Sequence, residues 1–239
     1  MKSRLGVNVD HIATLRNARG ESHPDVHKSA KIVKSSGADS ITIHLREDRR
    51  HIKDNDLIKI NKKLRIPLNL EMAPTNEMLK ISLKHRPDYI CIVPEKRTEI
   101  TTEGGLNLKK NSNFLKKAIC ELKKKEIRTS LFIEPNPESV LNANKLGAEC
   151  IEIHTGKICN LINKRKKYSK EFKKILNSVK YANNLGIEVH AGHGITFRSA
   201  KILSKIKGIE EFNIGHFIIG ESIFIGIKNC IKKFKKIIK

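Results

Sequence analysis

Short apolar runs with strand character recur from one end of the chain to the other, and each is followed by a segment of helical spacing. Phe172, Ile175, Leu176 and Val179 show that spacing most clearly, with apolar positions three or four residues apart. Parallel strands need a crossover that a helix supplies, so the alternation indicates a parallel α/β fold. The eight runs span residues 5–9, 40–43, 67–70, 89–93, 129–133, 150–153, 187–189 and 211–214.

Eight strand–helix units in 239 residues predict a parallel (β/α)8 TIM barrel with extra helices, since that fold takes about 250 residues. No Pro, Gly or Ser-rich linker divides the chain, so we expect one domain over residues 1–239. A doubly wound open sheet is the alternative. Asn136-Pro137 predicts a helix start, and Gly37, Gly147 and Gly186 predict helix ends that need a left-handed residue.

Polar residues at the carboxyl ends of the runs favour the barrel over the open sheet. Every run ends with at least one ionisable group. In a barrel these ends meet at one mouth, where active sites of this fold lie, whereas an open sheet would spread them along an edge. The residues at these ends are Asn8, Asp10, His11, His44, Arg46, Glu71, Glu95, Arg97, Glu134, Glu152, His154, His190, His193, Asn213 and His216.

One strand end is unusually rich in charge. The octapeptide at residues 44–51 holds two imidazoles, three guanidiniums and two carboxylates. Residues that move protons and bind anions at neutral pH are typical of an active-site rim. A solvated loop whose Arg side chains pair with Glu47 and Asp48 is the alternative. A divalent-metal site that includes Asp10 and His11 is a further alternative, although their spacing indicates one only weakly.

Glycines follow the last two predicted strands. Gly192 and Gly194 follow the seventh, and Gly215 follows the eighth. In barrels of this kind the corresponding loops often bind phosphate through backbone N–H groups and helix N-termini, so we expect a phosphate site there. A long loop over residues 94–105 ends in a glycine pair and is predicted to act as a lid.

The formal net charge of +23 raises nucleic acid as a partner. The Lys clusters at residues 123–125, 164–167, 173–174 and 232–236 fall on different predicted helices, interleaved with core-facing apolar residues. Trp is absent and aromatic residues make up 5% of the chain, which leaves little material for base stacking. We therefore expect solvated helix faces and no nucleic-acid partner.

Five Cys without a C-x-x-C pair predict free thiols in a reducing compartment, with Cys91 and Cys150 buried in strands. The first residues lack an apolar signal region, and no apolar run is long enough to cross a bilayer. We therefore expect a soluble, cytoplasmic protein without a membrane partner.

Seven motifs follow one another along nearly the whole chain. The longest are GVNVDHIATLRNARG at residues 6–20 and HLREDRRH at 44–51. Together the seven resemble the motifs of the pyridoxine 5'-phosphate synthase family, in that family's order. The others are NLEMA at 69–73, PEKR at 94–97 with TTEGG at 101–105, EIHTG at 152–156, AGHG at 191–194 and NIGH at 213–216.

The resemblance implies a homo-octamer that condenses 1-deoxy-D-xylulose 5-phosphate with 3-amino-2-oxopropyl phosphate, without a metal or organic cofactor. The implied products are pyridoxine 5'-phosphate, phosphate and water. The resemblance also implies that His44 and Glu71 accept protons, that His193 donates one, and that Glu152 stabilises charged intermediates. The implied ligands of the amino ketone phosphate are Asn8, Arg19, Gly194, Gly215 and His216, and those of the pentulose phosphate are Asp10, His11, Arg46, His51 and Thr101.

The residues themselves fit such chemistry. Imine formation, loss of water, phosphate elimination and an aldol-type closure are proton transfers around carbonyl carbons, which need several acids and bases. Two dianionic substrates need cationic and amide donors at two ends of one pocket, as the Arg-rich rim and the glycine loops offer. The alternatives are another phosphosugar barrel enzyme, such as a metal-assisted aldolase or isomerase, and a basic RNA-binding protein.

Overall fold

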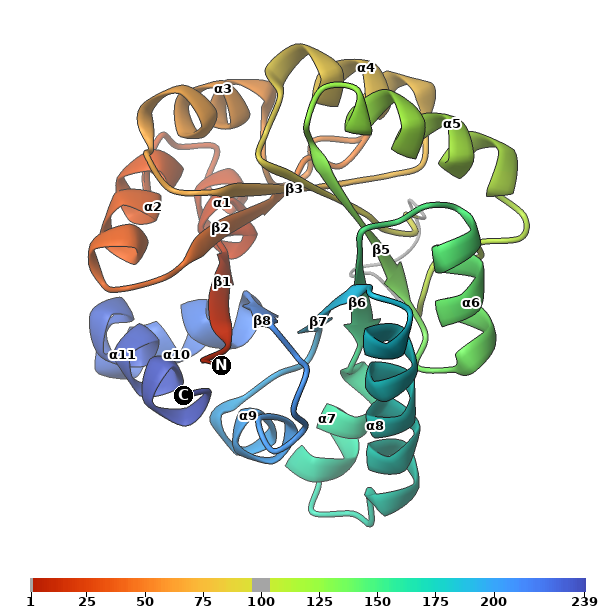
Figure 1. Ribbon diagram of the computed structural model, residues 1–239. Coiled ribbons are helices and arrows are strands. Elements are labelled where there is room, and N and C mark those ends of the chain that lie inside the picture. Colours follow the sequence, from red (N-terminus) through yellow and green to blue (C-terminus); the bar gives the residue numbers. More distant parts are fainter. Residues whose placement is uncertain (1, 96–103) are drawn as a thin grey trace.

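Eight parallel strands close into a barrel in the computed structural model, which describes residues 2–95 and 104–239 (Figure 1). Strands that are consecutive in sequence are neighbours in the barrel, and the last pairs with the first. The predicted (β/α)8 barrel is confirmed, and the open sheet is wrong. The strands are β1 (Arg4–Asn8), β2 (Ser40–His44), β3 (Leu68–Met72), β4 (Tyr89–Ile92), β5 (Arg128–Ile133), β6 (Cys150–His154), β7 (Glu188–Gly192) and β8 (Glu211–Ile214).

Helices form a ring outside the strands (Figure 1). Two helices follow each of β1, β6 and β8, which confirms the predicted extra helices. The helices of the described residues are α1 (Asp10–Ala18), α2 (Val26–Ser35), α3 (Asp54–Lys63), α4 (Asn76–His85), α5 (Ser112–Lys123), α6 (Pro137–Lys145), α7 (Gly156–Asn163), α8 (Ser169–Asn184), α9 (Phe197–Leu203), α10 (His216–Ile225) and α11 (Ile227–Ile237).

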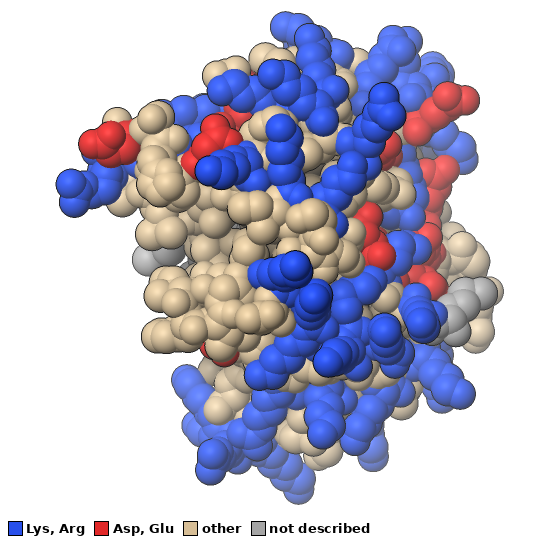
Figure 2. Space-filling view, turned by 90° about the vertical axis from the view of Figure 1, so that its left-hand side faces the viewer, with Lys and Arg blue, Asp and Glu red and all other residues tan. Residues whose placement is uncertain are grey.

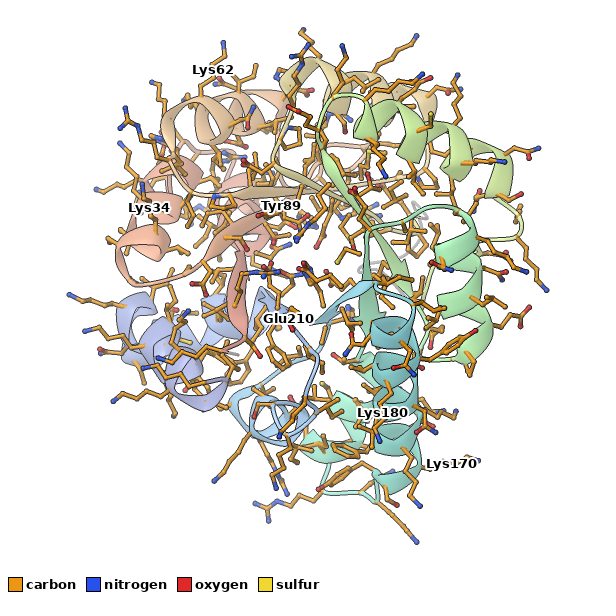
Figure 3. The ribbon with its side chains drawn as sticks, viewed as in Figure 1. Lys34, Lys62, Tyr89, Lys170, Lys180 and Glu210 are labelled. Atoms are coloured by element: carbon orange, nitrogen blue, oxygen red, sulfur yellow. The ribbon has the colours of Figure 1, made fainter. Side chains whose placement is uncertain are left out.

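The main apolar core lies between the strands and the surrounding helices, whereas the inside of the barrel is polar. Val7 and Ile151 belong to that core and are fully buried. Side chains alternate along a strand, so the neighbours of these residues face the barrel interior. There Arg128 stacks over the Tyr89 ring at 3.9 Å, and Tyr89 lies toward the middle of the ring in Figure 3. The inward faces therefore carry the polar groups that supply a site.

Most predicted boundaries agree with the structure to within one or two residues, and the seventh strand differs most. β7 begins one residue later than predicted and continues to Gly192, because this glycine still pairs with β6 and β8. The predicted helix signals are confirmed: Asn136 caps α6 with Pro137 in its first turn, and Gly37, Gly147 and Gly186 have positive φ angles.

Basic side chains extend outward from several helices. Figure 2 shows Lys and Arg spread from the top to the bottom of one side of the molecule. In Figure 3, Lys34, Lys62, Lys170 and Lys180 point away from the barrel. The Lys cluster at 164–167 was predicted on a helix but forms the turn between α7 and α8.

The thiols of Cys91 and Cys150 are buried in strands, as predicted, and all five Cys are free. Among the described residues, no helix combines the length and apolar character that crossing a membrane requires.

Asn136→Ala should lower the free energy of unfolding by about 1 kcal/mol, because the Asn136 side chain accepts a hydrogen bond from the backbone N–H of Ser139 at 2.8 Å. Urea denaturation followed by circular dichroism measures this loss. Asn144→Ala, at an exposed position of the same helix, is the matched control and should cause none, since Ala favours a helix more than Asn does. Equal losses in the two variants would contradict the capping role.

Candidate functional site

Asp10 joins the carboxyl ends of β1 and β2 at the barrel mouth. Its Oδ1 accepts a hydrogen bond from the backbone N–H of His44 at 2.9 Å, and its Oδ2 accepts one from Asn8 Nδ2 at 2.9 Å. Asn8 Oδ1 in turn accepts the backbone N–H of Asp10 at 2.8 Å. Burial raises the pKa of Asp10, against the opposing effect of the nearby His44. These bonds fix the first two strand ends against one another.

His44, at the end of β2, lies between two carboxyl groups. Its Nδ1 is 3.7 Å from Oε2 of Glu71, its direct partner on β3, and its Nε2 is 3.1 Å from Oε2 of Glu95, which follows β4. Glu95 also accepts the backbone N–H of Glu47 at 3.0 Å. The structure thus brings the predicted His44 and Glu71 together and adds Glu95, to which the sequence assigned no role.

Burial changes the ionisation of the carboxyl groups at the mouth. It raises the pKa of Glu71 well above its ordinary value, and the charges of Asp10 and Glu152 raise it further. Burial also raises the pKa of Glu152 to about 7, against the opposing effects of His190 and of a hydrogen bond from Asn213. Burial therefore favours the protonated form of Glu71, while Glu152 is close to its midpoint at neutral pH.

Glu152 occupies space that a glycine leaves open. Asn213 Nδ2 donates a hydrogen bond to Glu152 Oε2 at 2.7 Å. A Cβ atom at Gly192 would lie 1.9 Å from Glu152 Oε1. Any side chain at position 192 would therefore displace the carboxyl group, so this glycine is needed for the position of Glu152.

His193 follows β7 with a φ angle of 79°, a left-handed conformation that is rare for a residue with a Cβ. The ring of His154, at the end of β6, packs edge-on against it with centroids 5.0 Å apart, and His154 Nδ1 is 2.8 Å from Glu134 Oε1. Burial and the neighbouring His154 lower the pKa of His193 to about 4, so it is neutral at neutral pH. Both imidazoles and Gly194 line a hollow of about 500 Å³ next to α7.

Three further imidazoles form a second group at the mouth. The His11 ring lies 4.8 Å from that of His216 and 6.4 Å from that of His51, between centroids. Burial and these two neighbours lower the pKa of His11 to about 4. Burial and the charge of Arg46 lower the pKa of His51. The predicted His11, His51 and His216 are thus brought together from three separate segments.

Some side chains of the octapeptide lie at the barrel mouth, and others form ion pairs that hold the loop. Arg46 is 3% exposed, and its Nε is 3.7 Å from Glu95 Oε1. Arg50 pairs with Asp48 at 2.6 Å, and Arg49 pairs with two carboxylates outside the octapeptide. The local-pairing alternative is therefore right for Asp48 and Arg50, while Arg46 pairs both with Asp48, 3.9 Å from its Nε, and with Glu95 at the mouth.

Two predicted site residues are not placed in this cluster. Arg19 is the exposed C-cap of α1, roughly 13 Å along the helix from Asp10. Thr101 lies outside the described residues, as does most of the predicted lid. Arg16 is buried and holds Asp56 with hydrogen bonds of 2.7 and 2.9 Å, so it ties α1 to α3.

The backbone after β7 and β8 allows another group to approach closely. Gly194 has a φ angle of 76°, and a Cβ at Gly215 would lie 2.9 Å from the Cβ of Asn8. Gly215 is also the N-cap of α10, which begins at His216. The N–H groups of a first helical turn have no partners within the helix and favour anions. These features support the predicted phosphate site.

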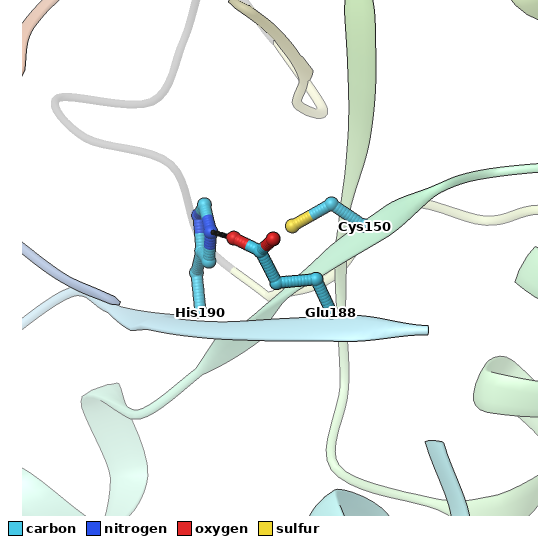
Figure 4. A group of neighbouring side chains, drawn as sticks. All are labelled: Cys150, Glu188 and His190. Atoms are coloured by element: carbon cyan, nitrogen blue, oxygen red, sulfur yellow. Dashed lines mark hydrogen bonds and ion pairs between the residues drawn. The ribbon is translucent and has the colours of Figure 1, made fainter. Parts of the chain in front are cut away.

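His190 lies deeper in the barrel than the sequence predicts. It pairs with Glu211, the first residue of β8, and its Nε2 is 2.7 Å from Glu188 Oε1. Cys150, Glu188 and His190 have ligand atoms within 4.8 Å of one another, the spacing of a metal site (Figure 4). Arg4, however, contacts both Glu188 and His190. A guanidinium thus already supplies the positive charge there, and it would repel a divalent cation.

This inner network places positive charge beneath the carboxyl groups of the mouth. Burial opposes a charge on His190, but Cys150 and Glu188 outweigh it and raise its pKa to about 10. Arg128 adds a second guanidinium on Glu188 at 2.8 Å. His190 is next to Glu152 on the neighbouring strand, so its charge acts on the mouth from below.

Four side chains at the mouth had no predicted role, although all were recognised as strand-end groups: Glu95, Glu134, His154 and Asn213. The sequence signal that could have indicated them was the two-residue alternation of side chains along a strand. His154 lies two residues after Glu152 and therefore on the same face of its strand. Periodicity gives the face of each strand but not which side chains meet across the barrel.

Comparison with known proteins finds a family model and relatives that match nearly the whole chain. The family model described as pyridoxal phosphate biosynthesis protein PdxJ matches residues 5–239. The chain is 58% identical to pyridoxine 5'-phosphate synthase of Pelagibacter ubique (strain HTCC1062), over 98% of both proteins. It is 50% identical to the enzyme of that name from Zymomonas mobilis subsp. mobilis, over 97% of this chain and 90% of that protein.

Solved structures resemble the barrel at low sequence identity. One is 3-keto-L-gulonate-6-phosphate decarboxylase from Vibrio cholerae, with a TM-score of 0.65 at 14% identity over 100% of both chains. Another is phosphoribosylanthranilate isomerase from Thermotoga maritima, with a TM-score of 0.57 at 13% identity over 98% of this chain and 97% of that one. These two likenesses concern the fold alone.

The difference in free energy of unfolding between Glu152→Gln and the unsubstituted protein should shift in favour of Glu152→Gln as the pH rises from about 5 to about 8. Folding raises the pKa of Glu152 from 4.5 to about 7, so the stability that its protonated form contributes is present below pH 4.5 and is lost as the pH rises through 7. The neutral amide of Gln does not titrate and avoids that loss. At about 1.4 kcal/mol per pKa unit, the unsubstituted protein loses roughly 2–3 kcal/mol of its free energy of unfolding over this pH range.

Urea denaturation at the two pH values measures the difference. Glu77→Gln, at a carboxylate whose side chain is 59% exposed, is the matched control. A stability difference between Glu152→Gln and the unsubstituted protein that does not change with pH would contradict the raised pKa.

Proposed function

The chain belongs to the pyridoxal phosphate biosynthesis protein PdxJ family, and we propose that the polar mouth of its barrel is the active site of a pyridoxine 5'-phosphate synthase. The reaction condenses 1-deoxy-D-xylulose 5-phosphate with 3-amino-2-oxopropyl phosphate and yields pyridoxine 5'-phosphate, phosphate and water. The observation that carries the proposal is the pairing of His44 and Glu71, which are in direct register on β2 and β3 with Nδ1 and Oε2 3.7 Å apart. The buried Asp10 fixes His44 by accepting its backbone N–H.

His44 and Glu71 act as a unit in this proposal. Burial next to other carboxyl groups raises the pKa of Glu71 well above its ordinary value, which favours its protonated form. His44 takes the first proton from substrate, and Glu71 becomes an acceptor only after it has released its own. A well-placed acid or base contributes roughly 10² to 10⁴ in rate, so two of them account for much of a multi-step condensation.

His193 donates a proton, and Glu152 stabilises positive charge on intermediates. Burial keeps His193 neutral at rest, so its proton is that of the neutral ring or one taken up from a substrate group. Glu152 is held by Asn213 at 2.7 Å and titrates near neutral pH, so its charge responds to a cationic intermediate.

The two phosphorylated substrates bind at different parts of the mouth. The glycine loops and the N-terminus of α10 support an anion site for the amino ketone phosphate, and the buried Arg46 with its neighbouring imidazoles supports one for the pentulose phosphate. We assign Asn8, Arg19, Gly194, Gly215 and His216 to the first substrate, and Asp10, His11, Arg46, His51 and Thr101 to the second.

A homo-octamer in the cytoplasm is the proposed working form. Free thiols fit a reducing compartment. Large apolar side chains lie exposed on neighbouring helices: Leu15 is 51% exposed on α1, and Ile223 and Phe224 are 74% and 82% exposed on α10. Apolar surface of this kind supports contacts between copies of the chain.

His193→Asn should abolish most product formation while keeping the fold, since Asn tolerates the left-handed backbone at this position. The purified protein is mixed with both substrates, and pyridoxine 5'-phosphate is measured by chromatography. We expect a loss of about 10²-fold or more. Near-normal turnover by His193→Asn would exclude it as the donor, and no product from the unsubstituted protein would overturn the proposed function.

Phe224→Lys should shift the protein to smaller assemblies, because a charge on this exposed ring cannot be buried between copies. Sedimentation velocity measures the change. Ile32→Lys, at a 40% exposed position on α2, is the control and should leave the assembly intact. An unchanged octamer in Phe224→Lys would rule out this surface as an interface.

A further inference from the structure

We propose that Glu95 is a positioning residue for the synthase reaction. It holds His44 in the tautomer with its proton on Nε2, so that Nδ1 is the nitrogen that exchanges protons with the substrates. The inference rests on the proposed function and deepens it, because it names the reacting atom of His44.

Glu95 is fixed in place and can only accept a hydrogen bond. Its side chain is 1% exposed, and its Oε1 accepts the backbone N–H of Glu47 at 3.0 Å while Oε2 lies 3.1 Å from His44 Nε2. Burial opposes its ionisation, but its bonds to His44 and Glu47 and the charge of Arg46 lower its pKa. An ionised carboxylate has no proton to give, so the hydrogen between Glu95 and His44 belongs to Nε2.

The opposite side of the ring is arranged differently. Glu71 Oε2 lies 3.7 Å from His44 Nδ1, which is longer than a hydrogen bond. Burial and the neighbouring carboxyl groups also raise the pKa of Glu71 well above its ordinary value, which weakens its attraction for a second proton on the ring. The lone pair of Nδ1 therefore remains available to an atom of a substrate.

The charge of Glu95 also acts during the reaction. When Nδ1 accepts a proton, the ring becomes an imidazolium, and the carboxylate on Nε2 stabilises it in the way that the buried Asp of a hydrolase triad stabilises its His. Glu95 further lies 3.7 Å from Arg46 Nε, so one carboxylate orients both the base and an anion-binding residue. The described titratable or charged groups that face His44 are Glu71 from β3, Glu95 after β4, Asp10 from α1, and Arg46 and His51 from the loop after β2.

Glu95→Gln tests the proposal, because it keeps the shape of the side chain and removes its charge. We expect kcat to fall by up to about 10⁴-fold, the loss that follows when the Asp of a hydrolase triad is replaced by Asn. The acid limb of the kcat–pH profile should also move to lower pH, because the imidazolium loses its partner. Glu47→Gln removes a charge from the adjacent loop and is the matched control, with kcat and profile expected to remain unchanged.

Each outcome decides the question. A normal kcat in Glu95→Gln overturns the proposal, and so does a lowered kcat with an unmoved acid limb, which indicates a merely structural role. Failure of the unsubstituted protein to make product overturns the proposed function instead.

The tautomer itself is measured without turnover, by ¹⁵N NMR of histidine-labelled protein, with the His44 signals assigned from their loss in His44→Asn. Protonated Nε2 and bare Nδ1 at neutral pH support the proposal even if Glu95→Gln does not fold. A proton on Nδ1 overturns it.

Discussion

Burial of acidic and basic side chains inside a closed barrel is the constraint on which the rest of the structure depends. The apolar core lies outside the strands, so the inward faces are free to carry Asp10, Glu71 and Glu152 out of water. An ionised carboxyl group without enough partners is costly in such a place, and it keeps its proton instead. Beneath them, Arg4 and the protonated His190 both pair with Glu188, and Arg4 also pairs with Glu211. The barrel thus separates a charged inner network from a mouth whose groups exchange protons.

Because of that separation, the mouth contains groups that differ in protonation at a single pH. The pKa of Glu71 is raised well above its ordinary value and that of Glu95 is lowered, while His193 is a neutral imidazole and Glu152 is near its midpoint. A condensation with several proton transfers needs acids and bases that are present together and do not neutralise one another. His44 reacts in this scheme because it lies between the acid and the carboxylate.

The sequence was sufficient for the fold and for most of the mouth. Alternation of strand runs and helical segments predicts the barrel, and the polar strand ends predict which residues converge. The sequence did not predict how deep a side chain lies in the barrel or which side chains contact one another. His190 was expected at the mouth but pairs with the first residue of β8, because a two-residue period does not report the stagger between strands. Glu95 reaches His44 from the far side of β3, a contact between strands that are not neighbours in the barrel.

The central claim is that burial raises the pKa of Glu71, next to His44, well above its ordinary value. The most direct test is the infrared difference spectrum between the unsubstituted protein and Glu71→Gln, recorded at pH values from about 4 to 9. The account predicts that the unsubstituted protein has a protonated-carboxyl C=O band that Glu71→Gln lacks, and that this band persists well above the usual titration range of a Glu. Loss of the band within the usual titration range of a Glu would contradict it.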